Sequence, residues 1–209
     1  MSDIEQLAQV VELHGRDIVD IGCGDGAFVR ALAKAGANPI GIEVSEAAVA
    51  RASATDPGNR YLLGSAEAIP LPDASVDVAV MMRSLHHVPD PNSAFPELKR
   101  VVRDLVYIAE PLATGEFFEL IKSVDDETEV RAKAQRAIAE ATGFERVRTI
   151  EYDVTISLAT FEALRDRVLA ADPGRAERFA TLEADLRTRF TPGDYTVPMR
   201  ADLLRSAGS

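Results

Sequence analysis

Ile18-Val-Asp-Ile-Gly-Cys-Gly-Asp-Gly-Ala-Phe28 is the stretch that decides the fold of this chain. Its β-branched run from Ile18 to Ile21 predicts a short, buried parallel strand, and the apolar spacing that begins at Ala27 predicts a helix. Three glycines at alternate positions separate the two, and glycine lets a backbone approach a ligand closely because it has no Cβ. The stretch therefore indicates a ligand-binding unit of strand, turn and helix.

An acidic residue ends the next predicted strand, Pro39 to Glu43. It lies about 20 residues downstream, the spacing at which a carboxylate can reach ribose hydroxyls. The letters Gly22-x-Gly24-x-x-Ala27 also satisfy the dinucleotide fingerprint, so a nicotinamide-dependent oxidoreductase is one alternative. Asp20 favours a cationic ligand instead, because a pyrophosphate-binding turn gains nothing from a fixed anion at its mouth.

The fuller string, Asp20-x-Gly22-x-Gly24-x-Gly26, resembles the first motif of the class I S-adenosylmethionine-dependent methyltransferases. A second string, Leu85-His-His-Val-Pro-Asp90, resembles a motif of the ubiquinone and menaquinone C-methyltransferase-like (type 11) group. The resemblance implies an α/β, Rossmann-like fold with a doubly wound, seven-stranded, mostly parallel sheet, an antiparallel last strand and helices on both faces. It also implies in-line methyl transfer from S-adenosyl-L-methionine to a small-molecule acceptor.

The same resemblance implies a set of cofactor-binding residues. Ser65 stands where many relatives carry Asp, so its hydroxyl would bond the adenine amino group without charge assistance. Helix capping is the alternative for Ser65 and Glu67. Arg83 would bind a carboxylate of substrate or cofactor, or pair with a surface acid. The expected cofactor-binding residues are Asp20, Gly22, Cys23, Gly24, Gly26, Glu43, Val44, Ser65, Ala66, Glu67 and Arg83.

His86, His87 and Asp90 are the expected catalytic residues, because they follow the predicted strand Val76 to Met82, whose carboxyl end faces the ligand. Adjacent histidines on a turn are expected to point in different directions, so at most one would face the acceptor. A structural histidine bonded to a backbone carbonyl is the alternative. No metal is expected, because a His-His-x-x-Asp site lacks a further ligand cluster nearby and His14 precedes the first strand.

Length and composition narrow the class of protein. A chain of 209 residues predicts one domain, 1–209, and its net charge of -11 argues against nucleic acid as a partner. The single cysteine, Cys23, excludes an internal disulfide, and no neighbouring base supports a nucleophile there. The absence of a signal-peptide pattern and of a long apolar run predicts a cytoplasmic protein that does not enter membranes. A homodimer is left open.

Two departures from the family pattern lie outside the first motif. A helical insertion at 159–194 separates the last two predicted strands, and its two helices are expected to close over the acceptor and select it. The alternative is that they only cover one flank of the sheet. Arg103-Asp104 replaces the Pro-Gly-Gly turn that relatives carry before the fifth strand, which predicts a tighter or distorted corner. Together with Ser65, this corner keeps a second alternative open, a catalytically inactive cofactor-binding partner protein.

Overall fold

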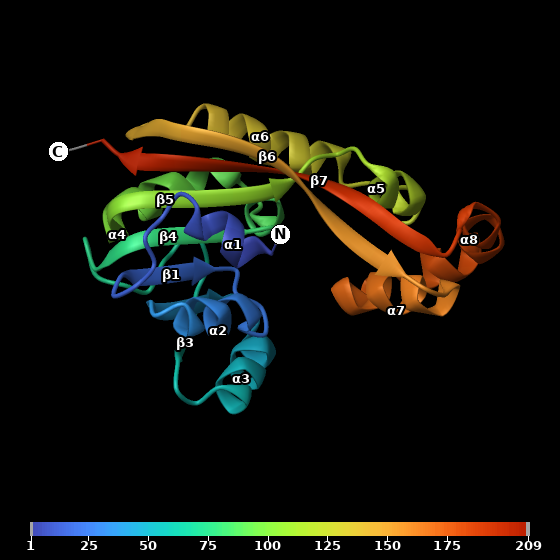
Figure 1. The fold of residues 1–209 in the computed structure, drawn as a ribbon, viewed down its shortest axis with the longest axis horizontal. Helices are drawn as coiled ribbons and strands as arrows, with labels where there is room; N and C mark the ends of the chain where they lie inside the picture. Colours follow the sequence, from blue (N-terminus) through green and yellow to red (C-terminus); the bar gives the residue numbers. More distant parts are fainter. Residues whose placement is uncertain (1, 208–209) are drawn as a thin grey trace. The chain divides into compact units, whose positions relative to one another are not determined.

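The computed structural model describes residues 2–207 and contains a seven-stranded sheet of order β3-β2-β1-β4-β5-β7-β6 (Figure 1). The first five strands pair in parallel and β7 is antiparallel, so the predicted Rossmann-like topology is confirmed. The strands are β1 (Asp17–Ile21), β2 (Asn38–Glu43), β3 (Arg60–Leu63), β4 (Val76–Met82), β5 (Val102–Pro111), β6 (Phe144–Leu158) and β7 (Gly193–Ser206).

Helices lie in all the connections between these strands except the one from β3 to β4. Between β6 and β7 the chain forms two helices, where the sequence places its insertion. The α-helices are α1 (Asp3–Ala8), α2 (Ala27–Lys34), α3 (Glu46–Thr55), α4 (Ala94–Val101), α5 (Glu116–Ile121), α6 (Thr128–Ala139), α7 (Phe161–Ala171) and α8 (Ala176–Arg189). The 3-10 turns are η1 (Leu85–His87), η2 (Pro91–Ser93) and η3 (Pro173–Arg175).

The chain divides into two compact units. The first unit holds the described residues of Met1–Glu110, Lys133–Ile150 and Arg200–Ser209, and the second unit holds Pro111–Ala132 and Glu151–Met199. The assignment of 1–209 to one domain stays a prediction.

The core of the first unit surrounds β1 and β4, which are almost entirely buried, as central parallel strands should be. One cluster joins these strands to α4 and α6 through side chains such as Phe95, Leu98 and Ile138. A smaller cluster contains Cys23 together with residues of α2, α3 and β3. Helices therefore cover both faces of this part of the sheet.

The core of the second unit is separate. It consists of α5, α7 and α8 packed with the ends of β6 and β7, and Phe161, Leu164 and Phe179 are among its buried members. Arg175 adds polar contacts within this unit, where its guanidinium pairs with Asp125 at 2.7 Å. Among the described residues, no helix has both the length and the apolar content that crossing a membrane requires.

The corner between α4 and β5 differs from the expectation. No separate turn exists, because α4 ends at Val101 and β5 begins at Val102, so Arg103 and Asp104 belong to the strand. The pairing of β4 with β5 shifts here, from Val76↔Val102 to Val78↔Leu105, which places an extra residue on β5 as in a β-bulge. The distortion predicted for this corner therefore takes the form of a bulge.

Two helices are also shorter than the apolar spacing predicts. The spacing of Ile4, Leu7 and Val10 predicts a helix that Gly15 ends, but α1 ends at Ala8 and Val10 lies in a turn. A second helix is predicted from Glu127 to Thr142, but α6 covers only Thr128–Ala139, and Val130 on its expected buried side is 43% exposed.

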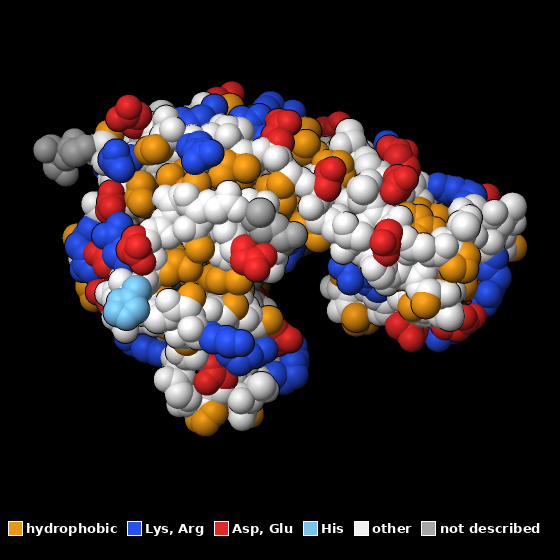
Figure 2. All heavy atoms as spheres, in the orientation of Figure 1, with side chains coloured by type: hydrophobic (Ala, Val, Ile, Leu, Met, Phe, Trp, Pro, Cys, Tyr) orange, Lys and Arg blue, Asp and Glu red, His pale blue; other side chains and the backbone are white. Residues whose placement is uncertain are grey.

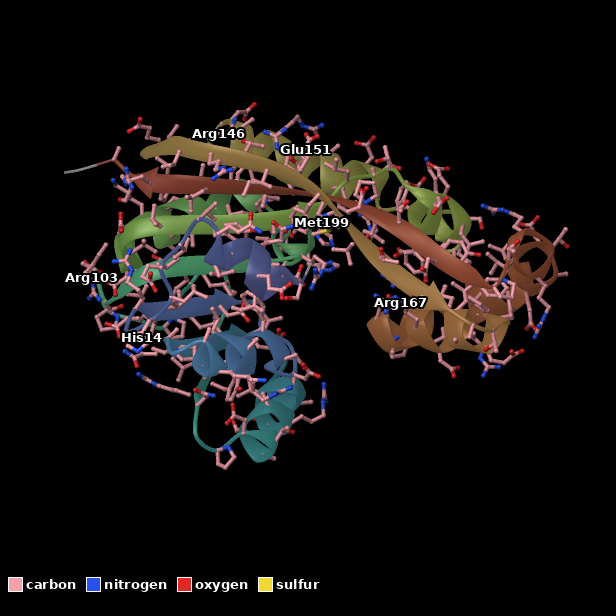
Figure 3. The ribbon with its side chains drawn as sticks, in the orientation of Figure 1. His14, Arg103, Arg146, Glu151, Arg167 and Met199 are labelled. Atoms are coloured by element: carbon pink, nitrogen blue, oxygen red, sulfur yellow. The ribbon has the colours of Figure 1, made fainter. Side chains whose placement is uncertain are left out.

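A buried acid ties β6 to β7 within the first unit. Asp202 is fully buried and accepts hydrogen bonds from the Thr149 hydroxyl (2.6 Å) and the Arg200 guanidinium (3.0 Å). Arg146, which Figure 3 labels on β6, pairs with the same carboxylate at 3.1 Å. Such a carboxylate is acceptable in a sheet because each of its oxygens has charged or hydroxyl donors.

On the face drawn in Figure 2, basic and acidic side chains are interspersed, so the described residues present no broad basic patch there.

Candidate functional site

The glycine turn after β1 is packed tightly on one side and open on another. Gly22 has a φ of +80°, and a Cβ built on it would meet the Ser84 Cβ at 2.5 Å. Gly24 has a φ of +55°, yet a Cβ built there would meet nothing within 4 Å. The backbone amides of Gly22 and Cys23 both donate to the Ile42 carbonyl, which fixes the turn on β2. The turn therefore leaves open space beside Gly24, where a ligand can approach the backbone.

Glu43 ends β2 beside this open space. Its Oε2 accepts the Gly24 amide at 3.0 Å and its Oε1 accepts the Ser45 amide at 2.9 Å. Ser45 in turn caps α3, because its hydroxyl accepts the Ala48 amide. Both carboxylate oxygens of Glu43 are thus oriented by the backbone, and each keeps a lone pair for another donor.

Asp20 is a buried acid of β1, two residues before the first glycine, and is 2% exposed. Burial raises the pKa of Asp20 to about 7, while the positive charge of Arg83 opposes this rise and the negative charge of Glu43 adds to it. A carboxylate in this position stabilises a cation that comes near it.

Cys23 is buried in the same turn, and its environment keeps the sulfur protonated. Burial, followed by the negative charges of Asp20 and Glu43, raises the pKa of the Cys23 thiol to about 12. A nucleophilic cysteine needs a thiolate near neutral pH, so Cys23 acts by packing rather than by bond formation.

An exposed apolar pair lies at the carboxyl ends of the two neighbouring strands. Val44, just after β2, is 69% exposed and Leu63, the last residue of β3, is 55% exposed. Glu43 and Leu63 are direct partners in the β2–β3 register. Exposed apolar side chains of this kind at a sheet edge are suited to a flat apolar ligand surface.

The segment after β3 forms a turn rather than a helix, with a bridge between Ser65 and Ala68. In the described structure no helix begins between β3 and β4, so Ser65 and Glu67 do not cap one. Ala66 is buried in the core, and Glu67 accepts a hydrogen bond from the Ser93 hydroxyl at 2.8 Å. Their predicted contacts with adenine stay predictions.

The turn that follows β4 lies against the glycine turn. The Ser84 hydroxyl donates to the Ile21 carbonyl at 2.7 Å, next to the close approach at Gly22. Arg83 has a φ of +54°, a strained backbone conformation for a side chain other than glycine. Its guanidinium pairs with Asp3 of α1 at 2.7 Å. Of the two roles expected for Arg83, the structure contains the ion pair with an acid.

Glu110, near the end of β5, holds the same turn from inside. It is fully buried, and its Oε1 accepts the amides of Ser84 (3.1 Å) and Leu85 (2.7 Å). Its Oε2 lies within hydrogen-bond distance of the Nδ1 of His86, which is also buried. The expected alternative, a histidine bonded to a backbone carbonyl, is replaced by a histidine bonded to a carboxylate.

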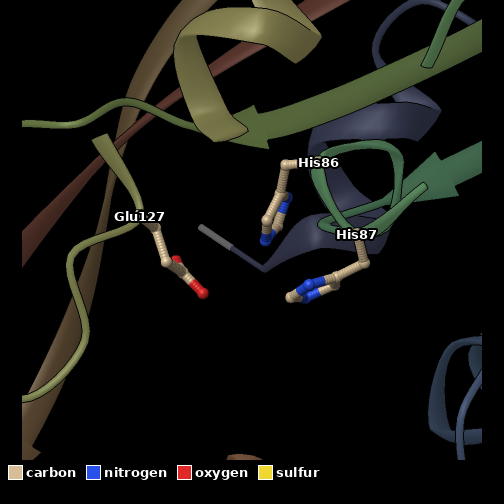
Figure 4. Close-up of side chains that lie close together, drawn as sticks. All are labelled: His86, His87 and Glu127. Carbon is tan, nitrogen blue, oxygen red and sulfur yellow. The ribbon is translucent and has the colours of Figure 1, made fainter. Parts of the chain in front are cut away.

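The two histidines differ in exposure but not in direction. His86 is buried and His87 is exposed, yet their ring centroids lie 3.9 Å apart with planes inclined by 45°. Figure 4 shows both imidazoles side by side on the turn that follows β4. The expectation that adjacent histidines point apart is wrong here, because the two rings lie against each other on the 3-10 turn η1. Asp90 is exposed and caps η2, where its carboxylate accepts the Asn92 amide.

Three residues of this site are absent from the set that the sequence predicts. Glu110, Ser84 and Leu63 all lie at or just beyond the carboxyl end of a strand in the parallel part of the sheet. Position alone was therefore an available signal, because ligands of such sheets bind outside the carboxyl ends of strands.

Comparison with known proteins agrees with this geometry. Residues 19–109 match the profile of the methyltransferase domain family designated Methyltransf_11. These residues are therefore similar to a methyltransferase domain. The match includes most of β1, the glycine turn, Glu43 and the His86–His87 turn. Methyltransferases of this family use S-adenosylmethionine as their methyl donor.

Curated relatives match about half of the chain. An uncharacterized methyltransferase of Mycobacteroides abscessus is 38% identical over 108 residues, which is 49% of this chain and 42% of that protein. A ubiquinone biosynthesis O-methyltransferase of Methylococcus capsulatus is 37% identical over 118 residues, 54% of this chain and 46% of that protein. The chain thus spans less than half the length of these relatives.

Solved structures share the fold across nearly the whole chain. A SAM-dependent methyltransferase from Aquifex aeolicus has a TM-score of 0.63 at 17% identity and covers 97% of this chain and 89% of its own. The [4+2]-cyclase SpnF has a TM-score of 0.69 at 19% identity and covers 99% of this chain and 80% of its own. At these identities the likeness shows the fold alone.

Proposed function

We propose that this chain transfers the methyl group of S-adenosylmethionine to a small-molecule acceptor at the carboxyl edge of β1, β2 and β4. The observation that carries the proposal is the Glu43 carboxylate, which two backbone amides orient beside the open space at Gly24. A carboxylate so oriented is suited to a ribose, whose two hydroxyls are donors that it can bind in a charge-assisted way.

The other residues fit the remaining parts of this ligand. Asp20 is the buried anion for the ammonium and sulfonium charges, and burial strengthens that attraction. Val44 and Leu63 offer apolar surface to the adenine, with Ser65, Ala66 and Glu67 following β3. The turn at Gly22, Cys23, Gly24 and Gly26 gives the backbone its close approach.

The ligand, when bound, supplies an already activated methyl group. The residues of this chain must therefore mainly hold the acceptor in line with that methyl group, and such positioning is worth about 7–11 kcal/mol. The chain needs no nucleophile of its own, which agrees with a Cys23 thiol that stays protonated. An acceptor that bears a proton also needs a base, and His86, His87 and Asp90 lie beyond β4 for that role.

The test is the affinity of Glu43→Ala for S-adenosylmethionine, measured by titration calorimetry. Loss of a hydrogen-bonding charge should weaken binding by about 1.5–3 kcal/mol. Glu46→Ala is the matched control, because Glu46 is an exposed acid at the start of α3 that has no part in the site. Equal affinity of Glu43→Ala and the wild type, with the circular dichroism of both unchanged, would contradict the proposal.

Titration calorimetry also distinguishes a methyltransferase from a nicotinamide-dependent oxidoreductase. A nicotinamide-dependent enzyme should bind NAD, whereas the buried Asp20 carboxylate repels a pyrophosphate. We expect heat from S-adenosylmethionine and none from NAD at equal concentrations.

A further inference from the structure

Glu110 holds the turn η1, which carries His86 and His87, through its buried carboxylate. Its side chain is 0% exposed and that of His86 is 4% exposed, so this carboxylate and imidazole meet away from solvent. One carboxylate oxygen accepts two backbone amides of the turn and the other faces His86 Nδ1. A buried carboxylate is costly unless its oxygens are satisfied, and here three donors satisfy them.

This contact selects the tautomer of His86. A carboxylate can only accept hydrogen bonds, so Nδ1 of His86 must be the donor. The neutral ring then carries no proton on Nε2. The negative charge of Glu110 also stabilises any positive charge that develops on the imidazoles.

His87 lies next to His86 and reaches the surface. It is exposed while His86 is buried, and the two ring centroids lie 3.9 Å apart. Glu110, His86 and His87 therefore form a row that runs from a buried anion to an exposed imidazole. The row begins beside Ser84, which touches the glycine turn at Gly22.

We propose that Glu110 is a positioning residue that holds His86 and, through it, His87, and that His87 accepts the proton of a protic methyl acceptor. The chemical class of that acceptor is a hydroxyl or N–H compound. As the new bond to the methyl carbon forms, the carbon–sulfur bond breaks with its electron pair on sulfur, and the acceptor's proton moves to His87. This inference rests on the proposed function, since S-adenosylmethionine is the methyl donor.

Glu110→Gln tests the positioning role without removing the side chain. The amide oxygen of Gln can still accept the Ser84 and Leu85 amides, so the turn is preserved. Its NH₂ group can only donate to His86 Nδ1, which should move the proton of His86 to Nε2. The chain has three histidines, so nitrogen-15 spectra of the imidazoles resolve each tautomer. We expect the His86 and His87 signals to change and the His14 signal to stay.

Methyl transfer is measured with S-adenosylmethionine labelled in its methyl group and the small-molecule fraction of the source cells. Glu110→Gln and His87→Gln should each lower transfer by roughly 10²-fold, the range of general base catalysis. Both should bind S-adenosylmethionine as the wild type does. The acid limb of the pH–rate profile should move to lower pH in Glu110→Gln, because the stabilising carboxylate is gone. His14→Gln, an exposed histidine before β1, is the control and should change none of these readouts.

Two results would overturn the proposal. The first is a wild-type His86 with its proton on Nε2. The second is a Glu110→Gln variant whose His87 signal and pH–rate profile match those of the wild type. A wild type that does not bind S-adenosylmethionine, or that binds it but labels nothing, would instead contradict the proposed function, so the two failures are distinguishable.

Discussion

At the residue scale, an acid at the end of a strand can be identified from the sequence when it belongs to a family motif. An acid outside such a motif is missed. Glu43 follows the glycines at a spacing that has a known physical meaning, so its place at the site is predictable. Glu110 is not marked by such a spacing, and its role at the site depends on contacts with residues 24 to 26 positions earlier in the chain. Those contacts exist because β4 and β5 are neighbours, which only the folded sheet shows.

The buried carboxyl group of Asp20 predicts how the affinity for S-adenosylmethionine depends on pH. Because burial raises its pKa to about 7, Asp20 is mostly protonated in slightly acidic solution and ionised in slightly basic solution. The ionised form attracts a cationic ligand, so affinity for S-adenosylmethionine should rise about tenfold as the pH increases through 7. Calorimetry on either side of pH 7 measures this rise.

Asp20→Asn is the control for that titration, and its affinity should be weak and nearly independent of pH over the same range. The same substitution weakens binding but should stabilise the fold in basic solution. An acid whose folded pKa is above its ordinary value of 3.8 destabilises the fold as the pH increases from that value to about 7. Asp20→Asn should therefore unfold at a higher temperature than the wild type at pH 8 and at a similar temperature at pH 4. A wild-type affinity that is flat across pH 7 would contradict this role of Asp20.

At the scale of elements, the bounds of strands are better predicted than the corners between them. The largely apolar run Val76 to Met82 coincides with β4, because a strand that is buried on both faces is rich in apolar residues. The corner between α4 and β5 was expected as a turn and is instead a direct junction with a bulge. Its conformation depends on charged contacts between strands, which a one-dimensional pattern does not contain.

Those contacts centre on Arg103, which Figure 3 labels near the amino end of β5. Its guanidinium pairs with Asp77 of β4 and Asp17 of β1, both at 2.9 Å, and it donates to the Ala74 carbonyl. Arg103→Ala should lower the free energy of unfolding by about 1 kcal/mol, because these groups are partly exposed and solvent screens them. Urea unfolding measures the loss, which about 1 M salt should reduce.

The pH dependence of this effect follows from Asp77. Burial acts to raise the pKa of Asp77, but hydrogen bonds from Arg103 and the Asp17 amide outweigh it and hold the pKa below its ordinary 3.8. A carboxylate with a lowered folded pKa stabilises the fold above its ordinary value and loses that effect as the pH falls through the folded value. The difference between Arg103→Ala and the wild type should thus shrink below pH 3.8. A difference that is constant down to acid pH would show that packing, not charge, holds the corner.

At the scale of the whole molecule, fold and activity are separate conclusions. The fold is shared with proteins of different names, a methyltransferase and a [4+2]-cyclase among them, so the fold alone does not select a reaction. The selection comes from the residues at the strand ends of the first unit. The roles of α7 and α8 in acceptor choice, and a homodimer, stay predictions of the sequence, because neither follows from contacts within one unit.

The two separate cores lead to the last prediction, which compares two phenylalanines. Phe95 is 4% exposed in the core of the first unit, and Phe179 is 2% exposed in the core of the second. Truncation of either to Ala removes a large buried side chain and should cost about 3–5 kcal/mol. The cores share no described member, so the Phe179→Ala cavity should loosen α7 and α8 while the strand ends that hold Glu43 and Asp20 keep their geometry.

We expect Phe179→Ala to bind S-adenosylmethionine within about twofold of the wild type. Phe95→Ala should bind it more weakly, because its cavity lies in the core that supports β1 and β4. Calorimetry gives both affinities, and hydrogen exchange locates the loosened helices. If Phe179→Ala lost binding as fully as Phe95→Ala, the cores would unfold together and the cofactor site would depend on the entire chain.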